Sequence, residues 1–150
     1  MRCLDERIKV LERAILAKGR LREEHKALKT VSGIGDVLAL TIALETGDIT
    51  RFPSPGQFAS YARMVDSRES NGKSKGTGNA RCGNKHLSWA FIEAAHFAVR
   101  YDPTVKRFYQ RKCSKKLAVV AIKAVAHKLA RACYHMMRDR TAFDASRAFG

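Results

Sequence analysis

Residues 84–101 read NKHLSWAFIEAAHFAVRY, and this stretch is apolar almost all the way round when it is wound as a helix. A helix with so little polar surface belongs at the centre of a helical protein, because each of its faces needs a neighbour. Proline fits badly inside a helix, so the helix is expected to end at Asp102-Pro103. Two apolar stripes run along it at helical spacing: Leu87, Phe91, Ala94 and Ala98 form one, and Trp89, Ile92 and Val99 form the other.

A glycine-rich, basic segment at residues 63–86 leads into this helix. It reads RMVDSRESNGKSKGTGNARCGNKH, with four glycines and six cations against two carboxylates. Glycine lets backbone N–H groups turn toward a close ligand and the cations supply a positive field, so a phosphate is the expected guest. The competing interpretation is a solvated loop. The candidate phosphate ligands are Arg68, Lys73, Lys75, Arg81 and Lys85, and the hydroxyl groups are those of Ser67, Ser70 and Ser74.

Two further helices are predicted after Pro103. Residues 103–115 form a strongly basic helix, and residues 117–138 form the last long one. The long helix has an apolar stripe and, on a separate side, a row of cations that is either a solvated face or a phosphate-contacting face. The apolar stripe consists of Val119, Ile122, Ala126, Leu129, Cys133 and Met136; the row of cations consists of Lys116, Lys123, His127, Arg131 and Arg138, of which Lys123 and Arg131 are the candidate phosphate ligands.

A Gly-x-Gly turn lies in the first half of the chain, within residues 28–47. Apolar residues lead into Gly33-Ile34-Gly35, and an apolar helix follows at once with Asp36 as its expected cap. This pattern resembles the helix-hairpin-helix motif, in which backbone N–H groups at a helix N-terminus contact a DNA phosphate without reading sequence. Gly33 and Gly35 would make that contact, and the alternative is a tight turn between two packing helices. Another helix is expected at Ser54-Pro55, with serine as its cap and proline in its first turn.

Residues 1–27 are predicted to form a helical arm. Leu4, Ile8, Leu11 and Ile15 follow one another at steps of four, three and four, which is the spacing of a coiled-coil seam. Too few apolar residues lie off this stripe to build a core, so the arm needs a partner. A second copy of the chain is the favoured partner, which makes the protein a homodimer or higher oligomer, and internal packing is the alternative. The seam fades after Gly19.

The composition limits the classes of function and of partner. The chain has 150 residues and a net charge of +15, which is spread over several elements and points to a nucleic acid. No apolar run approaches the roughly 20 residues of a membrane span, so a membrane is not an expected partner. The four cysteines form no C-x-x-C pair and the histidines have no metal-ligand spacing, so no metal site is predicted. No convincing strand appears, and the expected fold is all-α.

Several ordered stretches together resemble the C-terminal transposase domain of a bacterial insertion-sequence family. The resemblance covers residues 28–150, and residues 1–27 are similar to the coiled coil that joins the two halves of such proteins and pairs protomers. Members are serine-dependent transposases whose N-terminal half resembles a Holliday-junction resolvase with acidic metal ligands. The matching stretches are Gly33-Ile34-Gly35, residues 47–52 (GDITRF), 70–73 (SNGK), 83–87 (GNKHL) and 121–130 (AIKAVAHKLA).

The resemblance implies DNA recombination through a serine that attacks a phosphodiester, and it places that nucleophile at Ser70. Many relatives have Ser-Gly directly together where Asn71 intervenes here, so Ser67 and Ser74 remain lesser candidates. No cofactor is expected in this chain. A divalent metal such as Mg²⁺ belongs, on this interpretation, to a missing N-terminal half, and the chain is one part of a longer protein. The implied partners are DNA and, as in some members, a guide RNA, in the bacterial cytoplasm at the nucleoid.

Two functions from different classes follow from these residues. One is part of a recombinase that binds DNA and supplies a serine nucleophile to a composite active site. The other is a non-catalytic helix-hairpin-helix module that binds DNA or structured RNA. A covalent protein–DNA adduct distinguishes the two, since only the recombinase forms one.

Overall fold

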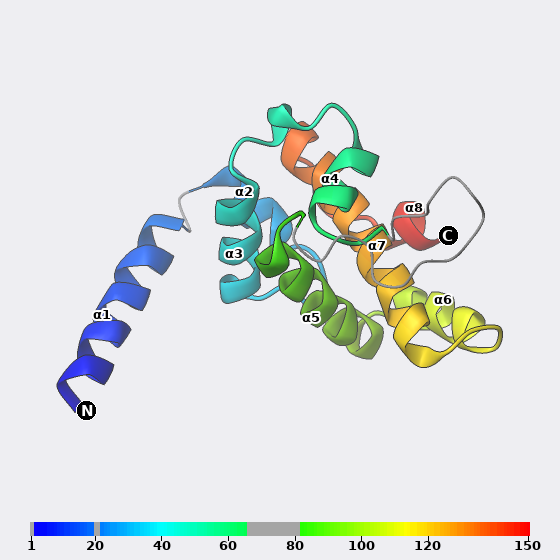
Figure 1. Ribbon diagram of the computed structural model, residues 1–150, viewed down its shortest axis with the longest axis horizontal. Coiled ribbons are helices and arrows are strands. Elements are labelled where there is room, and N and C mark those ends of the chain that lie inside the picture. Colours follow the sequence, from blue (N-terminus) through cyan, green and yellow to red (C-terminus); the bar gives the residue numbers. More distant parts are fainter. Residues whose placement is uncertain (1, 20–21, 66–81) are drawn as a thin grey trace.

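The structure, a computed structural model, describes residues 2–19, 22–65 and 82–150. Within these ranges it contains helices and no strand, so the prediction of an all-α fold is confirmed. The arrangement is shown in Figure 1. The elements are α1 (Arg2–Gly19), α2 (Glu23–Leu28), α3 (Asp36–Thr46), a short 3₁₀ helix η1 (Ile49–Arg51), α4 (Pro55–Tyr61), α5 (Lys85–Tyr101), α6 (Pro103–Cys113), α7 (Ala118–Asp139) and α8 (Ala145–Phe149).

Side-chain caps start several of these helices, and the one at Ser54 is predicted from the sequence. The Asn84 carboxamide oxygen accepts from the N–H groups of His86 and Leu87 at 2.9 and 3.0 Å. Helix α5 ends before Asp102, as expected. The Asp102 side chain caps α6, whose first residue is Pro103. Ser54 caps α4 in the same way, with Pro55 in the first turn. The cap predicted at Asp36 is wrong by one residue: Gly35 occupies the cap position, and Asp36 is the first residue of α3.

The core lies where α5 packs on α7, with α3, α4 and α6 around this pair (Figure 1). Phe58, Phe91 and Tyr134 are buried there, and the Phe58 ring meets the Phe91 ring edge-on at 6.0 Å. Each large side chain of this kind contributes roughly 1.5–3 kcal/mol through the apolar surface that it removes from water. The hydroxyl of Tyr134 donates to the carbonyl of Phe52 at 2.9 Å, so its polar end is satisfied inside the core.

Two predicted core positions are wrong. Trp89 is 50% exposed, because only one face of α5 is fully buried and Trp89 lies off it. The helix is therefore central without being covered on every side. Val119 is 80% exposed, since the buried residues of α7 begin at Ala121, one turn into the helix.

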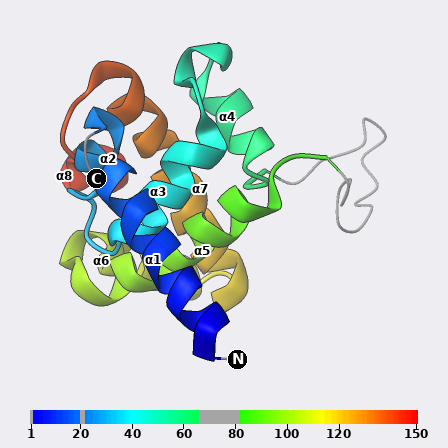
Figure 2. The same cartoon turned by 90° about the vertical axis from the view of Figure 1, so that its left-hand side faces the viewer.

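Helix α1 projects away from the other helices (Figure 1), and Figure 2 shows it from its own side with α3 and α5 behind it. The stripe residues Leu4, Ile8, Leu11 and Ile15 are between 49% and 64% exposed. The helix ends at Gly19, which packs on Leu40 of α3. In α2, His25 and Leu28 are buried against the body of the protein. Across the described residues, no helix is long and apolar enough to cross a membrane.

Candidate nucleic-acid interface

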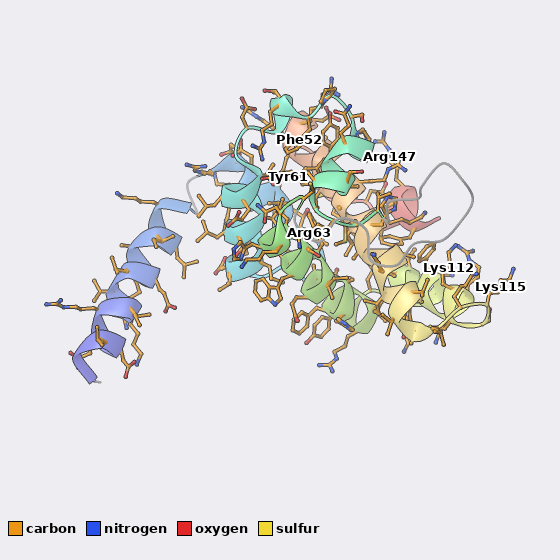
Figure 3. All side chains as sticks on the ribbon, viewed as in Figure 1. Phe52, Tyr61, Arg63, Lys112, Lys115 and Arg147 are labelled. Atoms are coloured by element: carbon orange, nitrogen blue, oxygen red, sulfur yellow. The ribbon has the colours of Figure 1, made fainter. Side chains whose placement is uncertain are left out.

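Hydrogen bonds join the two ends of the glycine-rich segment at its base, where it meets the helical body. The N–H of Asn84 donates to the carbonyl of Tyr61 at 2.7 Å, and Nε of Arg63 donates to the carbonyl of Cys82 at 2.9 Å. Arg63 and Gly83 have positive φ angles of 58° and 82°, which let the backbone turn sharply on both sides. Figure 3 labels Tyr61 and Arg63 at this base. The structure thus fixes where the segment leaves the helical body and where it returns.

A polar cluster surrounds this base. Nδ2 of Asn84 donates to Oε2 of Glu45 at 2.7 Å and to the hydroxyl of Tyr61 at 3.5 Å. The Arg51 guanidinium lies over the rings of Phe52 and Tyr61, 4.6 and 4.9 Å from their centroids. The hydrogen bond from Asn84 lowers the pKa of Tyr61, and Arg51 lowers it further. Asn84 therefore links the start of α5 to the end of α3 while it also caps α5.

Most of the predicted catalytic segment falls outside the residues that the structure describes. Ser70 and its alternatives Ser67 and Ser74 lie there, as do Arg68, Lys73, Lys75 and Arg81. Lys85 is described: it is exposed and is the first residue of α5, directly after the base of the segment. Among the described residues, no group of three or more His, Cys, Asp or Glu side chains could hold a metal ion.

The Gly33–Gly35 turn has two different glycines. Gly33 has a φ of +109° and packs so tightly on α5 that an added Cβ would lie 2.6 Å from the backbone nitrogen of Ala98. Gly35 is exposed, precedes α3, and has nothing within 4 Å of where a Cβ would stand. The residues of the turn and the first turn of α3 border an open cavity of about 510 Å³ together with Phe97 and Tyr101, whose rings stack at 6.3 Å.

A carboxylate already occupies the N-terminus of α3. Asp36 forms an ion pair with Lys29 at 2.8 Å and lies 3.8 Å from Nε2 of the buried His25. An incoming phosphate would meet this negative charge beside the backbone N–H groups of the turn. The turn lies far from the base of the glycine-rich segment, because Gly33 contacts α5 at Ala98 and Lys85 is 13 residues away, or about 20 Å along the helix.

The basic side of α7 borders a second cavity, of about 470 Å³. Of the two phosphate ligands predicted on this helix, Arg131 lines the cavity and Lys123 is half-buried elsewhere on α7. Burial lowers the pKa of Lys128 and of His127, and the neighbouring cations lower both further. The cavity is completed by α8, on which Figure 3 labels Arg147.

Several residues of these sites were not predicted from the sequence. Glu45, Arg51 and Tyr61 come together at the base through contacts between distant parts of the chain, and only the GDITRF match pointed near them. Lys128 belonged to neither the apolar stripe nor the basic row predicted for its helix, and no helix was predicted after residue 138, where Arg147 lies. A cap pattern was present as a signal: Asp144 accepts from the N–H groups of Ser146 and Arg147.

Comparison with known proteins identifies relatives along nearly the whole chain. The 43.6 kDa protein of insertion element IS110 from Streptomyces coelicolor is 28% identical over 142 residues, which is 93% of this chain and 35% of the relative. A "Probable family 20 transposase" of Pseudomonas aeruginosa is 29% identical over 95% of this chain and 44% of its own length. The 44.8 kDa protein of insertion element IS116 from Streptomyces clavuligerus is 25% identical over 93% and 36%.

This chain therefore spans between about a third and under half of the length of these relatives. The family model described as transposase IS116/IS110/IS902 matches residues 25–110, from α2 to α6 and across the glycine-rich segment. That match covers more than half of the chain. The chain belongs to the transposase IS116/IS110/IS902 family.

Proposed function

We propose that this chain is the serine-bearing part of a DNA transposase, with Ser70 as the nucleophile. The observation that carries the proposal is the hydrogen bond at the base of the glycine-rich segment. The N–H of Asn84 donates to the carbonyl of Tyr61 at 2.7 Å, and both residues lie within the stretch that matches the family model. A nucleophile must meet its phosphate in a narrow range of positions, and fixed ends limit where the segment can reach. A covalent DNA adduct on Ser70 is the direct test.

The proposed reaction is a transesterification. The Ser70 oxygen attacks phosphorus, a bond from oxygen to phosphorus forms, and the bond to one deoxyribose oxygen breaks. The serine proton goes to a base, and the departing deoxyribose oxygen takes up a proton; attack by the hydroxyl of another strand then reverses these steps. Arg68, Lys73, Lys75 and Arg81 would stabilise charge on the non-bridging phosphate oxygens. A serine hydroxyl also needs activation, and the carboxylates and divalent metal for it are proposed to lie in another part of the protein.

A second candidate function is a non-catalytic helix-hairpin-helix module that binds DNA or RNA. The exposed Gly35 in front of α3 favours it, because backbone N–H groups there can approach a phosphate. The negative charge of Asp36 beside them weakens it. This module would bind nucleic acid and form no covalent bond, so the adduct assay separates the two functions.

DNA binding by this chain is expected to have little sequence preference and a steep salt dependence. Its cations occur on separate elements, including Arg63 at the segment base, Lys112 on α6 and Arg147 on α8 (Figure 3). Each neutralised phosphate contributes a slope of about −0.9 in log K against log salt concentration. Fluorescence anisotropy with two unrelated duplexes measures both properties. An affinity that stays level between low and moderate salt, or that differs widely between the duplexes, contradicts the prediction.

The arm is proposed to pair two chains through Leu4, Ile8, Leu11 and Ile15. These side chains are about half exposed or more, and no other described helix covers them. A coiled coil with a second chain would bury this apolar surface. Leu11→Asp with Ile15→Asp should convert a dimer into a monomer by light scattering, since it places carboxylates in the seam. Lys9→Ser with Arg13→Ser removes the same net charge off the seam and should leave the mass unchanged. A wild-type monomer, or a dimer that survives the seam variant, excludes this pairing.

A further inference from the structure

The 470 Å³ cavity has the size of a small-ligand site and lies beyond the residues that match the family model. It is formed by the second half of α7, the connection that follows it and α8. Its walls combine cationic and apolar side chains. The lining includes Lys128, Arg131, Met136, Phe143, Asp144 and Arg147.

Basic side chains outnumber carboxylates in the wall of the cavity. The basic side chains of the lining include Lys128, Arg131 and Arg147, and among the described lining residues the one carboxylate is Asp144. That carboxylate is engaged in capping α8, where it accepts from the Ser146 hydroxyl at 2.6 Å and from two backbone N–H groups. In the described part of the chain, no ion pair within 4 Å engages Arg131 or Arg147. An anion entering the cavity would therefore meet a surplus of positive charge.

The rest of the wall is apolar and is held in place by contacts with other elements. Met136 is 3% exposed, Phe143 is half-buried, and both line the cavity. The N–H of Phe143 donates to Oγ1 of Thr30 at 2.8 Å, which ties the connection to the end of α2. Nζ of Lys128 donates to the carbonyl of Ala148 at 2.9 Å, which ties α8 to α7. The cavity is thus formed by the fold before any ligand enters.

We propose that this cavity takes one nucleotide of a single-stranded nucleic acid. The phosphate would lie against Arg131 and Arg147, and the base would lie against Met136 and Phe143. A nucleotide combines a charged phosphate with a flat base, so it fits a wall that is basic on one side and apolar on the other. Guanidinium groups match the geometry of a phosphate. A cavity of about 470 Å³ admits one such unit and excludes a duplex. The inference rests on the proposed nucleic-acid binding of this chain.

Photo-crosslinking tests the site directly. The full chain is mixed with a single-stranded oligonucleotide, as DNA in one arm and RNA in the other, in which 5-iodouracil replaces successive bases. Irradiation joins the modified base to the side chain against which it lies, and mass spectrometry locates the joined peptide. We expect crosslinks at Met136 or Phe143 with at least one of the two nucleic acids. Crosslinks confined to the exposed rings of Trp89, Phe97 and Tyr101 overturn the proposal.

A matched pair of variants distinguishes binding in the cavity from general electrostatic attraction between the basic protein and the oligonucleotide. Arg131→Gln with Arg147→Gln should lower the yield of the cavity crosslink and the oligonucleotide affinity by about tenfold, because two guanidinium contacts to phosphate are lost. Lys106→Gln with Arg107→Gln removes the same charge from the exposed surface of α6 and should lower the affinity by about twofold. Equal losses in the two variants overturn the cavity site and leave nucleic-acid binding standing. If the wild-type chain binds no oligonucleotide, both the proposed nucleic-acid binding and the cavity site are wrong.

Discussion

Ser70→Ala is expected to abolish strand transfer by a longer protein that joins this chain to the proposed acidic N-terminal half. Removing a nucleophile typically lowers the rate by about a thousandfold or more, because no other group can form the covalent intermediate. DNA binding should stay nearly intact, since the variant removes one hydroxyl and no charge. The measurement is recombination of a donor and a target plasmid, with DNA affinity determined on the same preparations.

Ser67→Ala and Ser74→Ala are the controls for this prediction, because both serines belong to the same basic segment. Each should retain most of the strand transfer. If Ser70→Ala recombines and one of the other two variants does not, the nucleophile is the other serine. If all three recombine normally, the serine mechanism is wrong for this protein.

Gly33→Ala is expected to lower the free energy of unfolding by about 3 kcal/mol, as the sum of two effects. A φ of +109° is strained for any residue with a side chain, and the new Cβ would lie 2.6 Å from the backbone nitrogen of Ala98 and 3.0 Å from the carbonyl oxygen of Ala94. Neither neighbour can move aside cheaply, because both belong to the backbone of α5. The turn would have to leave α5 or carry the strain.

Gly35→Ala is the matched control two residues away. Its φ of −84° suits alanine, and nothing lies within 4 Å of the added methyl group. The free energy of unfolding should fall by about 0.5–1 kcal/mol, because alanine caps a helix less well than glycine, and this loss is well below that expected for Gly33→Ala. Urea denaturation of both variants measures the difference. Similar stabilities for the two variants would show that Gly33 does not pack on α5 as described.

Local signals allowed much of the helical order to be predicted from the sequence. Ser54-Pro55 and Asp102-Pro103 act on residues within a few positions, through a capping oxygen or a missing N–H group, so their effect can be predicted without knowledge of the fold. The cap assigned to Asp36 failed by one residue because Gly35 can take the extended conformation there without a side-chain bond.

The burial of individual positions depended on tertiary contacts that no periodicity reveals. Trp89 shares the apolar pattern of α5 and is half exposed, and the close packing of Gly33 on α5 depends on a helix that is distant in the sequence. The hydrogen bond from Asn84 to Glu45 joins residues 39 positions apart, and no local pattern around either residue predicts this contact. The candidate nucleophile Ser70 was placed by family resemblance, and it lies outside the described residues.

The central claim is that this chain forms a covalent bond to DNA through Ser70, and mapping that bond is its most direct test. The full-length protein is incubated with its donor DNA and denatured, the DNA is digested, and the adduct is located by mass spectrometry. The account predicts a nucleotide attached to the Ser70 oxygen, and no adduct with Ser70→Ala. A reaction that recombines DNA without any protein–DNA adduct, or with the adduct on another residue, would contradict it.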